Sequence, residues 1–171
     1  MSSPSTLPPG YSFVDAAPPL QAYLDLRRLS GLSPKTPAQG EGALSGSWAF
    51  GTVAYHDPHS SEVSEPDIVA MARIIGDGGW YFIVADMAVL PEHRRKGLGE
   101  ALLRRLLQQI KERAPEGALV TLLADEMGRG LYKRCGFVES APESIGMWDV
   151  LSAEKEKENI SGGQNVPVSS Q

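Results

Sequence analysis

The chain predicts an α/β fold with a mixed, mostly antiparallel central sheet that is covered by helices. Two amphipathic helices come first, two strands joined by a glycine-rich turn follow, and the rest alternates strand, helix, strand, helix and strand. Because strands and helices bury their apolar faces against one another, this order is typical of a helix-covered sheet. With 171 residues, 42% hydrophobic and 22% charged, the chain has the size and composition of one globular domain.

The folded domain is expected over residues 12–151. Residues 1–11 predict a flexible N-terminal arm rich in Ser and Pro, and residues 152–171 predict a flexible tail rich in Glu, Lys, Ser, Gly and Asn. Such segments have too few apolar residues to offset the entropy lost on folding.

Two helices open the domain. Apolar residues at helical spacing predict a helix over Leu20–Leu29, which Gly31 ends. Thr36–Leu44 is expected to be a second short helix because Pro37 suits its first turn.

Two strands joined by a tight turn form a hairpin. Ile68–Ile75 and Trp80–Leu90 are rich in β-prone residues, and Gly76-Asp77-Gly78-Gly79 between them is a turn signal. Trp48–Tyr55 predicts the strand before this hairpin.

The second half begins with the clearest helix, Gly97–Ala114, whose apolar residues lie on one face. A buried strand is expected over Ala118–Ala124, and Asp125 can cap a short helix that runs to about Arg134. Ile145–Leu151 predicts the last strand.

A short basic segment between an apolar strand and the long helix predicts an anion site. Arg94, Arg95 and Lys96 precede Gly97 and Gly99. Unpaired N–H groups and the dipole at a helix start attract anions, and glycines let a ligand approach the main chain. We therefore expect this segment to bind a pyrophosphate.

Two other phosphate motifs do not fit. A dinucleotide loop needs a third glycine where Leu102 stands, and no repeated βαβ half follows. A Walker loop needs its Lys after the last glycine, whereas Lys96 precedes Gly97 and Gly99.

The pattern Arg94-x-x-Gly97-x-Gly99 after an apolar strand resembles the acetyl-CoA loop of the GNAT superfamily of N-acetyltransferases. A second block, Leu131–Phe137, is similar to that superfamily's Leu-Tyr-x-x-x-Gly-Phe segment, in the right order and at the right distance. Arg73–Gly79 and Arg28–Leu32 more loosely resemble a small-molecule amine subgroup. The resemblance covers roughly residues 12–151.

The resemblance implies a sheet splayed at its middle, with acetyl-CoA bound in the opening. Main-chain groups of the splayed strand would bond the pantetheine arm, and the glycine loop would hold the pyrophosphate. The cofactor-binding residues implied in this way are Met87, Ala88, Val89, Arg94, Arg95, Lys96, Gly97, Leu98, Gly99, Glu100 and Asp125. Asp125 and Gly128 depart from the Asn and Ala of many relatives.

Catalysis would use a phenol and a carboxylate. Tyr132 is at the family's position for the acid that protonates the departing sulfur, and an N–H of Met87 or Val89 is expected to polarise the thioester carbonyl. Asp86 is the candidate base or water holder, because an unpaired carboxylate in an apolar strand is costly and a catalytic role would account for it. The alternative for Asp86 is a carboxylate paired with a buried donor. Strand alternation predicts that the side chains of Asp86 and Ala85 lie on opposite faces of the sheet.

The acceptor site is less defined. Asp77 and Tyr81 are candidates for lining its mouth, although Asp77 also fits a plain turn former. His56 and His59 have neither the spacing nor the partners of a metal site, so no metal is expected.

These observations predict an acetyl-CoA-dependent N-acetyltransferase that acetylates a primary amine of a small molecule by direct transfer in a ternary complex. A protein lysine or N-terminal acceptor, and a catalytically lapsed CoA-binding module, remain alternatives.

Composition adds expectations about partners and compartment. The net charge of −5 argues against nucleic acid, and no apolar run is long enough to span a membrane. Cys135 is the sole cysteine, which excludes an internal disulfide, and no secretory signal is recognised, so a cytoplasmic location is expected. A homodimer is left open.

Overall fold

The computed structural model describes residues 6–58 and 66–151. Its described strands form one sheet with the order β1-β2-β3-β4-β5, antiparallel except for the parallel pair β4–β5. The strands are β1 (Tyr11–Val14), β2 (Ala49–Tyr55), β3 (Asp67–Gly76), β4 (Tyr81–Val89) and β5 (Leu119–Thr121). The predicted mixed, mostly antiparallel sheet is confirmed.

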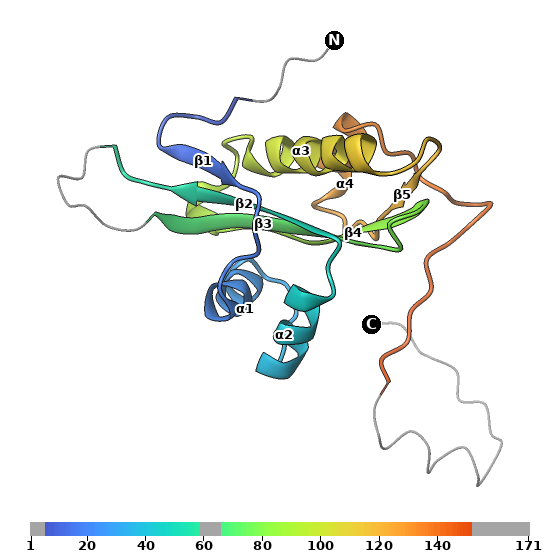
Figure 1. The fold of residues 1–171 in the computed structure, drawn as a ribbon, viewed down its shortest axis with the longest axis horizontal. Helices are drawn as coiled ribbons and strands as arrows, with labels where there is room; N and C mark the ends of the chain where they lie inside the picture. The colour runs from blue at the N-terminus through green and yellow to red at the C-terminus, as the bar shows by residue number, and fades with distance from the viewer. Residues whose placement is uncertain (1–5, 59–65, 152–171) are drawn as a thin grey trace, which may run out of the picture. The chain divides into compact units, whose positions relative to one another are not determined.

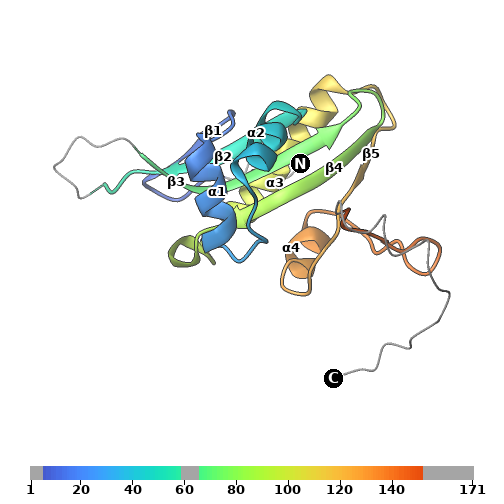
Figure 2. The same ribbon diagram turned by 90° about the horizontal axis from the view of Figure 1, so that it is seen from below.

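Helices cover both faces of this sheet. They are α1 (Leu20–Leu29), α2 (Pro37–Ser45), α3 (Leu98–Arg113) and α4 (Arg129–Arg134), with a 3-10 turn at Pro91–His93. Figure 1 shows α1 and α2 on one face and α3 on the other, and Figure 2 shows the same sheet from the side of α1 and α2.

Each face has its own apolar core. The larger cluster packs Leu102, Leu103 and Leu106 of α3 against β2, β3 and β4, and all three side chains are fully buried. The smaller cluster packs Tyr23 and Leu26 of α1 against the opposite face. A helix with one apolar stripe buries that stripe on a sheet, which is why the 3.6-residue period locates these helices well.

Local signals at the first two helices are confirmed. The structure has α1 over the predicted residues, and Gly31 follows it with φ +89°. Thr36 caps α2: its side chain accepts from the Gln39 N–H, and the Gln39 side chain accepts from the Thr36 N–H. This capping box, with Pro37 in the first turn, fixes where α2 begins.

Three predictions at the ends of the fold need correction. The strand Tyr11–Val14 lies partly in the predicted arm. The sequence does not predict this strand, because four residues carry too little pattern to be recognised. The predicted helix from Asp125 is shortened to Arg129–Arg134, since Gly128 and Gly130 disfavour helix. The strand over Ala118–Ala124 shortens to Leu119–Thr121.

The predicted last strand, Ile145–Leu151, is wrong. Its residues have no regular secondary structure, and Ile145, Met147 and Trp148 are at least 70% exposed. A strand needs a neighbour for its backbone groups, which an apolar pattern alone does not supply. The first compact unit ends at Val138, and the predicted tail, residues 152–171, lies outside the described residues, as do residues 1–5 of the arm.

Replacing Leu102 by Ala tests the core beneath α3. Leu102 is 0% exposed, so truncation leaves a cavity, and we expect a loss of about 2–5 kcal/mol in the free energy of unfolding. The matched control is Leu29→Ala. Because Leu29 is 48% exposed, this variant is expected to lose far less free energy of unfolding. Urea unfolding of both variants measures this, and equal losses would contradict the assignment of the core.

Candidate functional site

The edge of β4 beside β5 is paired along only part of its length. The ladder between the two strands joins Tyr81–Ile83 to Leu119–Thr121 and ends there. From Val84 to Val89, β4 pairs with β3 on one side, and no described strand pairs with its other side. Unpaired backbone N–H and C=O groups on this stretch are available to a ligand.

The segment after β4 turns sharply into α3. Arg95 has φ +60° and Gly97 has φ +79°, both in the left-handed region, and Gly97 is the N-cap residue of α3 without a side-chain cap. In the described part of the chain, no acceptor takes the N–H groups from Arg95 to Glu100. The helix start therefore presents a row of free donors with the positive end of the helix dipole.

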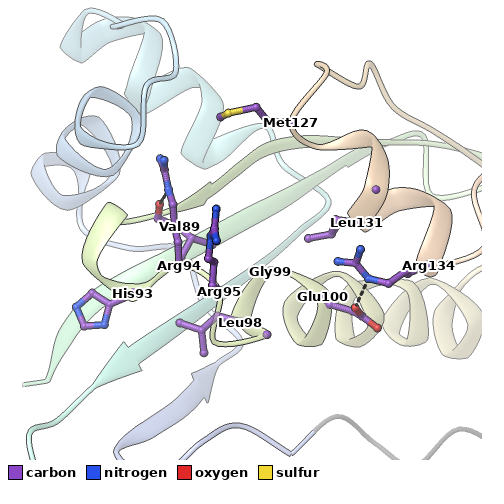
Figure 3. A pocket seen from close by; sticks show the side chains of 12 residues that line it. Val89, His93, Arg94, Arg95, Leu98, Gly99, Glu100, Met127, Leu131 and Arg134 are labelled. Atoms are coloured by element: carbon purple, nitrogen blue, oxygen red, sulfur yellow. Dashed lines mark hydrogen bonds and ion pairs between the residues drawn. The ribbon is translucent and has the colours of Figure 1, made fainter.

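A cavity of about 310 Å³ opens at this helix start. Figure 3 shows Arg94 and Arg95 on one side, and Leu131 and Arg134 reaching in from α4 on the other. The lining residues are Val89, His93, Arg94, Arg95, Gly97, Leu98, Gly99, Glu100, Met127, Gly130, Leu131 and Arg134.

The cavity depends on a close approach between α3 and α4. A Cβ atom placed on Gly99 would lie 3.0 Å from Cδ1 of Leu131 and 3.7 Å from Cγ2 of Val89. Gly99 is buried, so a larger residue here would push α4 away or fill the space between the helices. Glycine at position 99 is thus favoured because a side chain would have no space beside Leu131, and glycine at position 97 is favoured by its left-handed backbone conformation.

The cations of the loop have different partners. Arg94 donates from Nε to the Val89 carbonyl at 3.1 Å and from Nη2 to the Ser30 carbonyl at 2.8 Å, which ties the end of α1 to the end of β4. Lys96 donates to the Tyr11 hydroxyl at 2.8 Å. The Arg95 side chain has no partner among residues 6–58 and 66–151, and it lines the cavity.

Glu100 places a carboxylate beside the free N–H groups, but two guanidinium groups balance its charge. Arg104 donates to Oε1 and Arg134 donates to Oε2 at 3.0 Å. Their hydrogen bonds hold the pKa of Glu100 below its usual range. The ion pair with Arg134 also fixes the side chain of α4 that borders the cavity (Figure 3).

His93 lies in the cavity wall next to Arg94. Its Nδ1 is 2.8 Å from the Tyr11 hydroxyl, which also receives the bond from Lys96. Burial and the neighbouring Lys96 charge lower the pKa of His93, so its neutral form is favoured at neutral pH.

Tyr132 is half-buried on α4 and lies outside the cavity lining. Its ring makes an edge contact with Phe137, and its hydroxyl has no hydrogen-bond partner within the described ranges. Burial, followed by the neighbouring Asp125 carboxylate and Cys135 thiol, raises the pKa of Tyr132, so the phenol keeps its proton at neutral pH. A Cβ on Gly128 would lie 2.8 Å from Cε2 of Tyr132, so this glycine makes room for the ring.

Asp125 shapes the turn before α4. Its Oδ1 accepts from the Gly128 N–H at 2.7 Å. The side chain therefore has a structural partner, and its predicted contact with the cofactor stays a prediction.

Asp86 has charged and polar partners on three sides. Its Oδ2 accepts from the Tyr23 hydroxyl and from Nε of Arg73, both at 2.5 Å, and its Oδ1 accepts from Nη1 of Arg27. The side chains of Arg27, Asp86 and Arg73 are 7%, 12% and 15% exposed. This is the paired carboxylate that the sequence left as an alternative. The role of Asp86 as a base stays a prediction, and the geometry weighs against it.

Asp86 also interrupts the regular alternation of β4. The register shifts between Met71–Ala88 and Arg73–Ala85, so one residue of β3 faces two of β4, and Asp86 has φ +53°. This is a β-bulge. Ala85 pairs with Arg73, and Arg73 bonds Asp86, so Ala85 and Asp86 lie on the same face. The prediction that they face opposite sides is wrong, because alternation holds only in a regular strand.

Asp77 forms the hairpin turn. Its Oδ1 accepts from the N–H groups of Gly79, Trp80 and Tyr81 at 2.8, 3.0 and 3.2 Å, and these bonds lower the pKa of Asp77. The turn-former alternative accounts for all of these contacts. Tyr81 is 37% exposed and its hydroxyl is 3.4 Å from Oγ1 of Thr121, beside the end of the β4–β5 ladder.

The cavity gathers part of the predicted set and adds five residues to it. Of the predicted residues, it includes Val89, Arg94, Arg95, Gly97, Leu98, Gly99 and Glu100, and it does not include Met87, Ala88, Lys96 or Asp125. Five further residues line the cavity and are not predicted from the sequence: His93, Met127, Gly130, Leu131 and Arg134. The spacing of the last four, over positions 127, 130, 131 and 134, is that of one helix face, and it was an available signal.

No group of three potential metal ligands occurs in the part of the chain that the structure describes, and His59 lies outside it. Within the same residues, no helix is both long and apolar enough to cross a bilayer.

Comparison with known proteins gives a consistent result. Residues 50–139 match the family model described as Acetyltransferase (GNAT) domain. The chain is 33% identical over 88 residues to histone acetyltransferase TAP1 of Glycine max, and 33% identical over 89 residues to serotonin N-acetyltransferase 2, chloroplastic, of Oryza sativa subsp. japonica. These matches cover 51% and 52% of this chain but only 37% and 42% of the relatives, so the chain spans less than half the length of either.

Among solved structures, SA2161 from meticillin-resistant Staphylococcus aureus, a probable acetyltransferase of unknown function, superposes with a TM-score of 0.72 and 29% identity. The superposition covers 82% of this chain and 99% of SA2161.

Replacing Asp86 by Asn is expected to destabilise the protein in a pH-dependent way. Burial raises the pKa of Asp86, but the Tyr23 bond and the Arg73 and Arg27 charges hold it below its ordinary value of 3.8. A carboxyl with a lowered pKa stabilises the fold above its unfolded value, and this stabilisation is lost as the pH falls through the folded value.

The difference in unfolding free energy between wild type and Asp86→Asn should therefore be constant above about pH 5. It should shrink below pH 3.8. Urea unfolding at about pH 7 and about pH 3 measures it. An equally large difference at both values would contradict the ion-paired carboxylate.

Proposed function

Because the chain belongs to the GNAT acetyltransferase family, we propose that it transfers an acetyl group from acetyl-CoA to a primary amine of a small molecule, directly within a ternary complex. The observation that carries this proposal is the row of N–H groups from Arg95 to Glu100 beside the Arg95 side chain, none of which has a partner in the described part of the chain. Together they suit a doubly phosphorylated linker, because backbone donors and a cation converge on one open cavity.

The donor would extend from this loop along β4. On the stretch from Val84 to Val89, one edge pairs with no described strand, so its backbone N–H groups can donate to the carbonyl groups of the pantetheine arm and its backbone C=O groups can accept from the arm's amide N–H groups. At the end of that arm, an N–H of Met87 or Val89 would donate to the thioester carbonyl oxygen. A fixed donor of this kind stabilises the negative charge that develops when the amine attacks.

The transfer forms a carbon–nitrogen bond and breaks the carbon–sulfur bond. The amine nitrogen attacks the carbonyl carbon, the electron pair of the broken bond goes to sulfur, and sulfur leaves as a thiol when it receives a proton. Tyr132 would supply that proton, since its phenol is protonated at neutral pH and its hydroxyl has no competing bond to a described residue.

The amine must lose one proton before it attacks. An aliphatic amine with a pKa near 10.4 is charged at neutral pH, and deprotonation costs roughly 4–5 kcal/mol there. Asp86 is a weak acceptor for this proton because three donors hold its carboxylate. We therefore assign the proton to water at the open edge and leave the base role of Asp86 as the competing prediction.

Two other functions are separable by experiment. One relative is named as a histone acetyltransferase and another as a serotonin N-acetyltransferase, so both protein and small-molecule acceptors occur among similar proteins. Mass spectrometry of peptide products would identify a protein lysine or N-terminal acceptor. Tight acetyl-CoA binding without turnover on any amine would identify a lapsed CoA-binding module.

Replacing Arg95 by Asn should weaken acetyl-CoA binding about tenfold, because a charge-assisted bond to phosphate is worth about 1.5–3 kcal/mol and this site is exposed. Asn tolerates the left-handed backbone at this position, so the loop is retained. Calorimetry measures the change. The matched control is Arg129→Asn, which removes an exposed arginine outside the cavity lining. Equal affinities in the two variants would contradict the assigned role of Arg95.

Replacing Tyr132 by Phe should lower kcat by about 100-fold or more and leave the affinity for acetyl-CoA nearly unchanged, since a general acid acts on the leaving group. Release of free thiol from acetyl-CoA across a panel of primary amines measures the rate. Equal rates for the variant and the wild type would remove Tyr132 from the mechanism.

A further inference from the structure

The bulge in β4 changes which backbone groups face the open edge. Before the bulge, the Phe82 carbonyl faces β5, since it is 3.4 Å from Oγ1 of Thr121. After the bulge, the Leu90 N–H bonds the Val69 carbonyl of β3, and the Val89 carbonyl accepts from outside the sheet. The edge-facing positions are therefore even-numbered before the bulge and odd-numbered after it.

The side chains change faces at the same point. Phe82 and Val84 belong to the core beneath α3, and beyond the bulge Met87 and Val89 pack against that core. Ala88 belongs to the core beneath α1. Without the extra residue, the backbone N–H and C=O groups of positions 86 and 88 would face the open edge, and those of Met87 and Val89 would face β3.

The extra residue is held by side chains from two other elements. Tyr23 and Arg27 reach Asp86 from α1, and Arg73 reaches it from β3. Arg27 also donates to the Ser33 carbonyl at 2.9 Å, which leaves it little freedom to move. The carboxylate at the bulge is thus tied to α1 and β3 at once.

Backbone conformation alone does not explain the bulge. Asp tolerates the left-handed region better than most residues, yet extended backbone is the norm within a strand. The bonds from Tyr23, Arg27 and Arg73 favour the one conformation in which the carboxylate meets all three donors.

We propose that Asp86 is a positioning residue for acetyl transfer: tied to Tyr23, Arg27 and Arg73, it fixes the bulge and so turns the N–H groups of Met87 and Val89 to the open edge of β4. The inference rests on the proposed function, because these N–H groups matter for catalysis only if a thioester binds there. It differs from a base role, since the carboxylate itself never touches the amine.

Asp86→Asn and Tyr23→Phe test this proposal together. Each weakens the network, but Tyr23→Phe keeps the carboxylate and removes a bond that lowers its pKa, so a base mechanism predicts no loss of rate for this variant. We expect both variants to lower kcat, by as much as about 100-fold for Asp86→Asn, with a smaller rise in KM for acetyl-CoA because the same strand edge holds the pantetheine arm. The matched control is Asp25→Asn, which should behave as wild type: the Asp25 side chain is 38% exposed, and its bonds to described residues stay within α1.

An amine whose pKa lies below the assay pH separates positioning from proton removal. Such an amine is already neutral, so a lost base would no longer matter. We expect the Asp86→Asn defect to persist with this amine. Recovery of the wild-type rate, or full activity of Tyr23→Phe, would overturn the proposal.

A measurement without substrate keeps this test separate from the proposed function. The amide signals of Met87 and Val89 in NMR spectra of the full chain should shift in Asp86→Asn and Tyr23→Phe, and remain in place in Asp25→Asn. Unchanged signals in both network variants would overturn the positioning role. If Asp86→Asn does not fold, the same NMR comparison is made with Tyr23→Phe and with Asp86→Gly, because glycine can still adopt the left-handed backbone conformation. If wild type acetylates no amine while the signals shift, the proposed function fails and the link between network and bulge stands.

Discussion

The ion pairs of Asp86 lie where α1, β3 and β4 meet, and the arrangement of the open edge depends on them. A carboxylate buried to this degree is tolerated only when donors surround it, and Tyr23, Arg27 and Arg73 provide them. With its side chain held on the face of α1, the main chain at Asp86 adopts φ +53° and the strand gains a residue. Everything beyond that point on β4, including Val89 and the loop into α3, is shifted by this one residue.

The cations near the cavity divide into structural and free groups. Arg94 bridges carbonyls of β4 and α1, Lys96 bonds Tyr11, and Arg134 balances Glu100. Each of these arrangements holds a segment in place, whereas the Arg95 side chain has no partner among the residues that the structure describes, so its donors are available to a ligand. A count of basic residues in the sequence therefore overstates the free charge at the site, although the bonded arginines still contribute to the local potential.

Local signals predicted more of this molecule than distant ones did. The helix over Leu20–Leu29, the short helix that begins near Pro37 and the glycine loop before α3 each depend on neighbours within a few residues, and the sequence predicts each of them. The bulge at Asp86 depends on arginines 13 and 59 positions away. No periodic pattern carries that information, because the alternation rule assumes the regular strand that those arginines interrupt.

The same distinction applies to the site. The loop residues were found because they form one short motif, whereas Met127, Leu131 and Arg134 enter the cavity through the packing of α4 against α3. That packing depends on Gly99, whose missing side chain lets Leu131 approach. The motif therefore predicted the donors at the helix start, and the tertiary fold determined the opposite wall.

The family match begins at residue 50 and so excludes α1 and α2. The loop, the cavity lining and Tyr132 all lie inside residues 50–139, as does Asp86, whereas Tyr23 and Arg27 lie outside. The proposed acetyl-donor site thus lies in the part of the chain that the family model matches, and two of the three groups that hold its bulge come from a helix outside the match. Through Asp86, that helix is coupled to the strand on which the transfer is proposed to occur.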